Sequence, residues 1–297
     1  MAFDRSTRAL DHIVLPVTSV ERARARFAAL GFTVAPTGEH PFGTENCCIF
    51  LGNDTFIEPL AVAKREAVEA AMVGGNTFLL NDDAYRFRRD VEGFSHVVLK
   101  TDDAAADHEA FRDRAMSGGD MVRFERAFAL PDRSEGKASF ALAFARDHRA
   151  PDANYFTCEV VDAPQVDRAP LLDHPNGALA LTEIVTSEPN PSDFQYFLQR
   201  FLRRREMDNH SFGIEFALPN AKTSVLTPAG MRAFCGLETD EGRGLLHQTF
   251  VVAVRDLDAL TERYADADIE TVRIGQRILV PWAPGQGCPI LFEQENA

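Results

Sequence analysis

The sequence predicts an α+β fold built from tandem βαβββ modules, four of them arranged in two pairs. Two observations predict it. Near the N-terminus an apolar run typical of a strand leads directly into an amphipathic helical segment, and the same order returns further along the chain. The chain also has 297 residues, more than one average domain needs, which leaves room for two medium-sized domains.

The first module begins at residue 10. LDHIVLPV is rich in apolar and β-branched residues, as a strand is, and Thr18-Ser19 after it can cap a helix. The amphipathic segment VERARARFAAL then ends at Gly31, a residue typical of a helix stop. Three further strand candidates complete the module: FTVAP, NCCIFL and TFIEPLAV.

The second module repeats this order over residues 94–161. FSHVVLKT is the strand, Asp102-Asp103 the cap and AAADHEAFRDRAM the helix, which Gly118-Gly119 ends. Aligning His12 with His96 also aligns Phe27 with Phe111. The later strand candidates are MVRFERAFAL, ASFALAFA and NYFTCEVV.

Two weaker copies occupy the C-terminal half. ALTEIVTS leads into PSDFQYFLQRFL, and HQTFVVAV leads into RDLDALTERYA, followed by ETVRIGQRILV and PILFEQ. Residues 163–177 contain three prolines and no clear period, which is typical of a linker. We therefore predict an N-terminal pair of modules over 1–168 and a degenerate C-terminal pair over 169–297.

Charge and composition exclude several kinds of partner. The chain has 31 Lys and Arg against 45 Asp and Glu, and its net charge of −14 would repel nucleic acid and anionic membrane surfaces. Its apolar runs are too short to span a bilayer, and its five cysteines form no CxxC pair. We expect a cytoplasmic protein whose partner is a small molecule.

Two histidines hold the same position in two modules. A lone histidine in an apolar strand is either a core imidazole or a ligand. Because repeated modules that pack symmetrically bring equivalent positions together, His12 and His96 are expected to face one shared cleft. Two convergent imidazoles suit a divalent metal.

Two glutamates interrupt apolar strands. Glu58 lies in TFIEPLAV and Glu159 in NYFTCEVV, and burying either carboxylate without a partner would be costly. A metal would compensate both, although strand glutamates that face solvent would give the same pattern. The predicted ligand set is His12, Glu58, His96 and Glu159, suited to Fe, Mn, Co, Ni or Zn.

The C-terminal pair does not keep these residues. The repeat offset places Glu183 and Thr249 at the histidine positions, and Glu293 is the only obvious carboxylate in a last strand. We therefore expect no metal in this pair.

The segment GEHPFGTEN lies between two strands of the first module. A loop there would line the cleft, so His40, Thr44 and Asn46 are candidate substrate contacts. The same residue types also suit a tight turn without a role. The 23 phenylalanines of the chain favour an apolar or aromatic substrate.

Residues 10–62, with GEHPFGTEN and Glu58, resemble a glyoxalase-like member of the vicinal oxygen chelate superfamily, the superfamily of glyoxalases, bleomycin resistance proteins and extradiol dioxygenases. The resemblance is weaker but traceable over 94–161. It implies curved mixed sheets around a U-shaped metal cleft, with ligands from the first and last strands of each module. These positions hold His12, Glu58, His96 and Glu159.

The resemblance implies three alternative functions. The first is a metal-dependent lyase, isomerase or hydrolase that chelates a small substrate through adjacent oxygens, with Glu58 or Glu159 as ligand and catalytic base. The second is an Fe(II) extradiol-type dioxygenase with His12, His96 and Glu159 as its triad, although four-module dioxygenases usually hold iron in the C-terminal pair. The third is a non-catalytic small-molecule binding or resistance protein. Monomer and homodimer both remain open.

Overall fold

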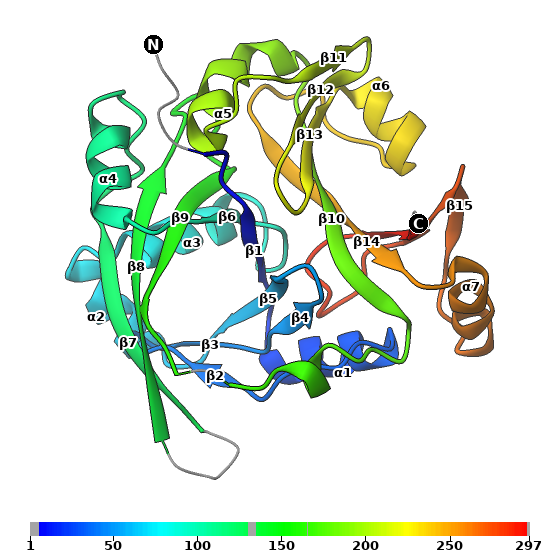
Figure 1. Ribbon diagram of the computed structural model, residues 1–297, viewed down its shortest axis with the longest axis horizontal. Coiled ribbons are helices and arrows are strands. Elements are labelled where there is room, and N and C mark those ends of the chain that lie inside the picture. Colours follow the sequence, from blue (N-terminus) through cyan, green and yellow to red (C-terminus); the bar gives the residue numbers. More distant parts are fainter. Residues whose placement is uncertain (1–5, 130–134, 165, 296–297) are drawn as a thin grey trace.

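The computed structural model describes residues 6–129, 135–164 and 166–295. Two curved mixed sheets and the helices around them confirm the predicted α+β class (Figure 1). The first sheet has nine strands in the order β2-β3-β5-β1-β6-β9-β8-β7, with β4 paired to β5. The second has eight strands in the order β11-β12-β13-β10-β14-β17-β16-β15. No helix in the described residues is long and apolar enough to cross a membrane.

The elements of the first sheet and its helices follow the chain in this order: β1 Leu10–Pro16, α1 Val20–Ala29, β2 Gly38–Glu39, β3 Thr44–Asn46, β4 Ile49–Leu51, β5 Thr55–Val62, α2 Arg65–Val73, α3 Thr77–Arg88, β6 His96–Lys100, α4 Ala104–Arg112, β7 Val122–Ala129, β8 Glu135–Ala145 and β9 Asn154–Asp162. Those of the second half are β10 Ala178–Ser187, α5 Gln195–Leu202, β11 Asp208–His210, β12 Gly213–Ala217, β13 Lys222–Leu226, α6 Pro228–Gly230, β14 Leu246–Val254, α7 Leu257–Asp266, β15 Val272–Ile274, β16 Arg277–Val280 and β17 Ile290–Gln294. Short 3-10 turns cover Ala169–Leu171 and Pro191–Phe194, and a π-helical turn covers Met231–Cys235.

Equivalent helices begin with equivalent caps. The side chain of Ser19 accepts a hydrogen bond from the Arg22 amide at the start of α1, and Asp103 accepts one from the Ala106 amide at α4. Asp256 caps α7 in the same way. Each cap satisfies a backbone amide that has no partner in the first turn, so each helix starts at a fixed place after its strand.

Strand register shows the symmetry within each pair of modules. β1 runs antiparallel to β6 with Val14 opposite His96 and His12 opposite Val98, so the two histidines hold equivalent positions. In the second sheet Val185 lies opposite Thr249 and Glu183 opposite Val251. Glu183 and Thr249 therefore occupy the two histidine positions of the second pair, as the repeat offset predicts.

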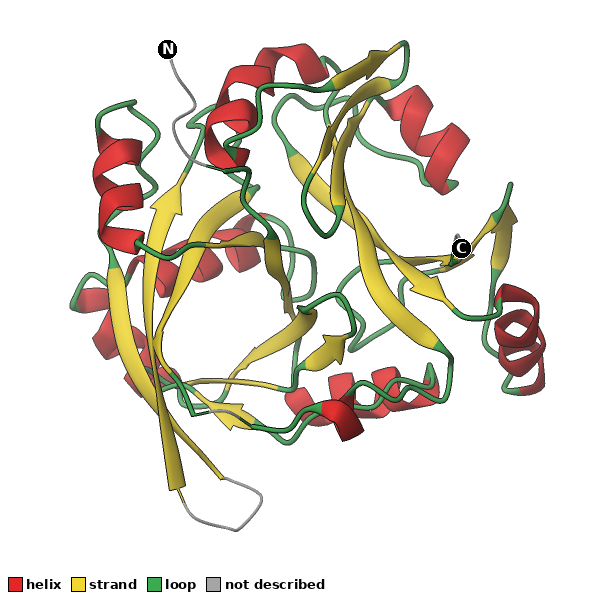
Figure 2. Cartoon of the chain, in the orientation of Figure 1, coloured by secondary structure: helices red, strands yellow, loops and turns green. Residues whose placement is uncertain are grey.

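The two faces of the first sheet bury different clusters. The outer face packs against α1 and α4 through Phe27 and Phe111, in a core that continues into the second sheet. The inner face holds Val14, Leu60 and Phe156, and α2 and α3 close against it. Figure 2 shows most helices at the periphery, around the two curved sheets. The first sheet therefore has a curved inner face that is closed on one side by a helical pair.

The segment between the sheets is docked onto the first one. The buried His174 accepts a hydrogen bond from the Thr33 amide at 3.0 Å, and its Nε2 lies 2.8 Å from the Phe50 carbonyl oxygen. The side-chain amide of Asn176 donates to the Leu30 carbonyl. These bonds tie the second half to the first across residues 163–177.

Candidate functional site

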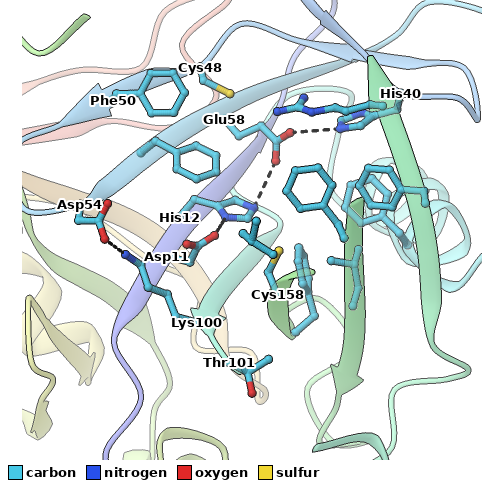
Figure 3. A pocket seen from close by; sticks show the side chains of 18 of the residues that line it. Asp11, His12, His40, Cys48, Phe50, Asp54, Glu58, Lys100, Thr101 and Cys158 are labelled. Carbon is cyan, nitrogen blue, oxygen red and sulfur yellow. Dashed lines mark hydrogen bonds and ion pairs between the residues drawn. The ribbon is translucent and has the colours of Figure 1, made fainter. Parts of the chain in front are cut away.

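A pocket of about 360 Å³ opens on the inner face of the first sheet (Figure 3). Side chains alternate between the faces of a strand, so Phe56 and Glu58 of β5 point inward together. Most of the wall is aromatic, and the phenylalanines that line it are Phe42, Phe50, Phe56, Phe78, Phe124, Phe140 and Phe156. The pocket is therefore largely apolar, with a few polar groups inside it, as small-molecule sites usually are.

His12 and Glu58 meet because β1 and β5 are parallel neighbours. His12 Nε2 lies 3.4 Å from Glu58 Oε2, and His12 Nδ1 lies 2.6 Å from Asp11 Oδ2. Burial opposes charge on the ring, but hydrogen bonds and charges from Asp11 and Glu58 outweigh it and raise the pKa of His12 to about 9. Burial also opposes charge on Glu58, yet His12, His40 and Asn46 lower its pKa to about 2. The contact between the two side chains therefore favours the charged form of each.

His40 approaches the other oxygen of the same carboxylate, as Figure 3 shows. Its Nε2 lies 3.8 Å from Glu58 Oε1, and its Nδ1 lies 2.9 Å from Thr44 Oγ1. Asn46 donates from Nδ2 to Glu58 Oε1 at 2.6 Å. Burial lowers the pKa of His40 to about 4, so its ring is neutral at pH 7.

The three residues predicted as substrate contacts thus have different positions. His40 lines the pocket, while Thr44 and Asn46 are buried behind it. Thr44 orients His40, and Asn46 orients Glu58.

His96 lies behind the aromatic wall. It is fully buried, its Nδ1 is 2.7 Å from Ser95 Oγ, and its ring packs against Phe78 and Phe156, which line the pocket. Its Nε2 has no hydrogen-bond partner among the described residues. Burial lowers the pKa of His96 to about 3. The structure therefore does not bring His96 into the pocket with His12.

Glu159 points to the other face of the sheet. Its Oε2 accepts a hydrogen bond from the Ala104 amide at 2.9 Å, where α4 begins. Its neighbours Cys158 and Val160 line the pocket instead. Because strand side chains alternate, a shift of one residue exchanges the faces. The expectation that Glu159 joins His12 and Glu58 is therefore corrected: the last strand of the second module places a thiol at the pocket, not a carboxylate.

The predicted four-residue metal set is consequently not assembled. Across the parts of the chain that the structure describes, no group of three or more His, Cys, Asp or Glu side chains is arranged as a ready metal site. His12 and His40 do both approach the carboxylate of Glu58, with Nε2–O distances of 3.4 and 3.8 Å. The Nδ1 atom of each ring contacts a second side chain, Asp11 for His12 and Thr44 for His40. Proteins orient metal-binding imidazoles in a similar way.

The equivalent place in the second sheet is filled by an ion-pair network. Arg277 Nη2 lies 2.7 Å from Glu183 Oε2 and 2.8 Å from Glu293 Oε2. Ser224 donates to Glu183 Oε1 at 2.5 Å, and Lys222 Nζ lies 3.4 Å from the same oxygen. The carboxylates at these positions are therefore neutralised by cationic side chains.

Comparison with known proteins identifies the family of the chain. The family model of the glyoxalase-like domain matches residues 10–202. No protein of curated function matches the sequence. A hypothetical protein from Staphylococcus aureus superposes with a TM-score of 0.67 at 13% identity, covering 96% of this chain and 99% of its own.

Two enzymes share the fold at greater distance. The Mn(II)-bound glyoxalase of Novosphingobium aromaticivorans has a TM-score of 0.54 at 11% identity, covering 98% of this chain and 83% of its own. The 2,2',3-trihydroxybiphenyl 1,2-dioxygenase of Sphingomonas wittichii strain RW1 has a TM-score of 0.50 at 13% identity, covering 98% and 91%. The matched domain spans well over half of the chain, and so the protein belongs to the glyoxalase-like domain family of the vicinal oxygen chelate superfamily.

Proposed function

We propose that the protein is a metal-dependent glyoxalase-like enzyme, a lyase, isomerase or hydrolase, acting on a small oxygenated molecule at His12, His40 and Glu58. One observation carries this proposal. The carboxylate of Glu58 lies between the Nε2 atoms of two imidazoles, inside a pocket whose wall is mainly aromatic. The position of each ring is set by a second contact, to Asp11 or to Thr44.

The donor atoms of these residues are of the types that bind divalent ions. Two imidazoles and a carboxylate form a borderline-to-hard donor set that suits Fe, Mn, Co, Ni or Zn. Asp11 and Thr44 occupy the Nδ1 sides of the rings, which leaves both Nε2 atoms directed at the carboxylate. Bound there, the ion would supply Lewis-acid polarisation of two adjacent substrate oxygens.

Glu58 is the candidate catalytic base. Asn46 holds its Oε1 and His12 faces its Oε2, so the carboxylate has one orientation in the pocket. A base must lie within hydrogen-bond reach of the proton that it removes, and Glu58 meets this condition for a substrate in the pocket. Glu159 does not, because its carboxylate is bonded at the start of α4.

The donor set also favours a second candidate, an Fe(II) dioxygenase. Two histidines and one carboxylate are the ligands of non-haem iron oxygenases, and here they would be His12, His40 and Glu58 instead of the triad expected from the repeat. Oxygen uptake on adding Fe(II) and a catechol would distinguish this activity from that of a lyase, isomerase or hydrolase.

Metal binding by matched variants tests the proposal. We expect one Mn(II) or Fe(II) per chain in calorimetric titration. H12A, H40A and E58Q should each reduce the affinity more than about 100-fold, which is more than the loss caused by replacing a residue that only contacts a ligand. E159Q is the matched carboxylate control and should keep full affinity. Affinity lost in E159Q and kept in H40A would contradict the assignment, and a folded native protein that binds no metal would favour the non-catalytic binding protein.

A further inference from the structure

The pocket contains two arginines as well as its aromatic wall. Arg126 of β7 lies with its guanidinium carbon 5.5 Å from the centre of the Phe140 ring, and that of Arg168 lies 4.5 Å from the centre of the Phe50 ring. All four residues line the pocket. Each cation is therefore spread over an aromatic surface that a substrate would touch.

Most other charged groups that line the pocket are already paired. Lys100 forms an ion pair with Asp54, and Asp11 and Glu58 both contact His12 (Figure 3). Asp102 also lines it, and its side chain is exposed to solvent. Within the described residues, by contrast, neither Arg126 nor Arg168 forms an ion pair with a carboxylate. The pocket thus contains two positive charges that no described carboxylate neutralises.

Arg126 is held across the open side of the curved sheet. A Cβ added at Gly38 of β2 would lie 3.0 Å from Arg126 Nη1 and 2.7 Å from Asn46 Oδ1. The guanidinium of Arg126, on the edge strand β7, therefore lies against the other edge strand, β2. It is also next to Asn46, which orients Glu58. A side chain at position 38 would have to displace one of these groups.

Both arginines act on the same part of the wall. Burial raises the pKa of the Cys48 thiol above its ordinary value, Glu58 raises it further, and the charges of Arg126 and Arg168 oppose that rise. Cys48 lines the pocket beside Phe50 (Figure 3). Both guanidinium charges thus act at Cys48, as the charge of Glu58 does.

We infer that the pocket takes a small aromatic acid, whose ring packs among the phenylalanines while its anionic group contacts Arg126 and Arg168. Planar guanidinium groups suit a carboxylate, and a volume of about 360 Å³ suits one ring with a short polar chain. The chain has a net charge of −14, so an anion needs such local cations to remain bound. The inference rests on the proposed function only in taking this pocket as the substrate site.

Three small molecules test the contributions of the carboxylate and of the aromatic ring to binding separately. Mandelate has a ring, a carboxylate and a neighbouring hydroxyl, mandelamide lacks the charge, and lactate lacks the ring. In calorimetric titrations we expect mandelate to bind about 10- to 100-fold more tightly than mandelamide, the range of one hydrogen bond to a charged group. We also expect it to bind more tightly than lactate.

Arginine variants locate the contact. R126Q and R168Q should each reduce the mandelate-to-mandelamide ratio about tenfold, while R65Q, on the exposed face of α2, should leave it unchanged. Far-UV circular dichroism of each variant verifies folding. Equal affinity for mandelate and mandelamide, no measurable mandelate binding, or a ratio unchanged in both variants would overturn the inference.

Failure of this inference differs from failure of the proposed function. Each titration is run with and without Mn(II), and Mn(II) affinity is measured for the same arginine variants. Retained Mn(II) binding with no preference for the acid overturns the aromatic-acid inference alone. A preference for mandelate that depends on both arginines, in a protein that binds no Mn(II), upholds this inference and overturns the metal-dependent activity.

Discussion

Replacing Glu159 separates a structural carboxylate from a functional one. The Glu159 carboxylate accepts the hydrogen bond of the buried Ala104 amide at the N-terminus of α4, where a negative charge also interacts favourably with the helix dipole. E159Q keeps an acceptor oxygen and removes the charge, so we expect a loss of about 0.3–1 kcal/mol in unfolding free energy. E159A also leaves the amide without its partner, and we expect a loss of about 1–3 kcal/mol.

Urea unfolding followed by circular dichroism measures these two losses, with metal titration run on the same samples. D162N, at the end of the same strand β9, is a control of equal charge change. The expected order of stability is native, E159Q, then E159A, with Mn(II) affinity constant throughout. If E159Q abolished Mn(II) binding and left unfolding unchanged, the orientation of this side chain would be refuted.

Three further perturbations have defined outcomes. D11N should lower Mn(II) affinity about 10- to 100-fold because Asp11 contacts the Nδ1 atom of His12, whereas D54N should not, because Asp54 pairs with Lys100 instead; equal losses in titration would argue against this. D107N should lower the unfolding free energy by about 3–5 kcal/mol in urea, because the buried Asp107 is paired with Arg8 and Arg203, and a loss below 1 kcal/mol would contradict that pairing. Burial lowers the pKa of His247 to about 3, so the unfolded chain binds a proton below pH 6.5 that the folded chain does not. His247 should therefore contribute a fall in stability of up to about 1.4 kcal/mol per pH unit from pH 6.5 towards pH 3. H247F should reduce the measured slope by that amount in urea titrations at stepped pH, and an unchanged slope would show that His247 does not contribute.

Repeat periodicity was sufficient to predict the architecture. The alignment of His12 with His96 and its continuation to Glu183 and Thr249 match the register of both sheets. This agreement has a physical cause, since paired modules keep the same strand register wherever their side chains pack in the same way. Glu58 could likewise be placed near His12, because the first and last strands of a module are parallel neighbours.

The residues next to Glu159 indicate the face of the strand on which its side chain lies. Phe156 precedes Cys158 by two residues, the same spacing as Phe56 before Glu58, and all four side chains line the pocket. Aligning the two phenylalanines would have placed Cys158 at the pocket and Glu159 on the opposite face. This signal was present in the sequence, whereas a charged residue in an apolar strand does not indicate which face it occupies.

The positions of His96 and His40 depend on segments outside the repeat. Phe78, which packs on His96, comes from α3, an insertion that no module pattern describes. His40 precedes a turn after the two-residue strand β2, and it reaches Glu58 only through the way that turn folds. Neither contact follows from a period of two or 3.6, so sequence patterns could identify His40 as a candidate without placing it beside Glu58.

The two halves of the chain show how one architecture can hold a pocket or close it. At the position of His12, the second sheet has Glu183, and Arg277 of β16 bridges this carboxylate to Glu293. The network satisfies its own charges and leaves the second sheet to form core with α5 and α7 through residues such as Phe201, Tyr264 and Phe292. In the first sheet the carboxylate of Glu58 meets imidazoles, and the two arginines of that pocket lie on phenylalanine rings, with no carboxylate partner among the described residues. An arginine that bridges two carboxylates satisfies the site internally, whereas arginines on aromatic rings, without a carboxylate partner in the described part of the chain, leave positive charge available to an anion. This difference favours the N-terminal pocket as the place where a substrate binds.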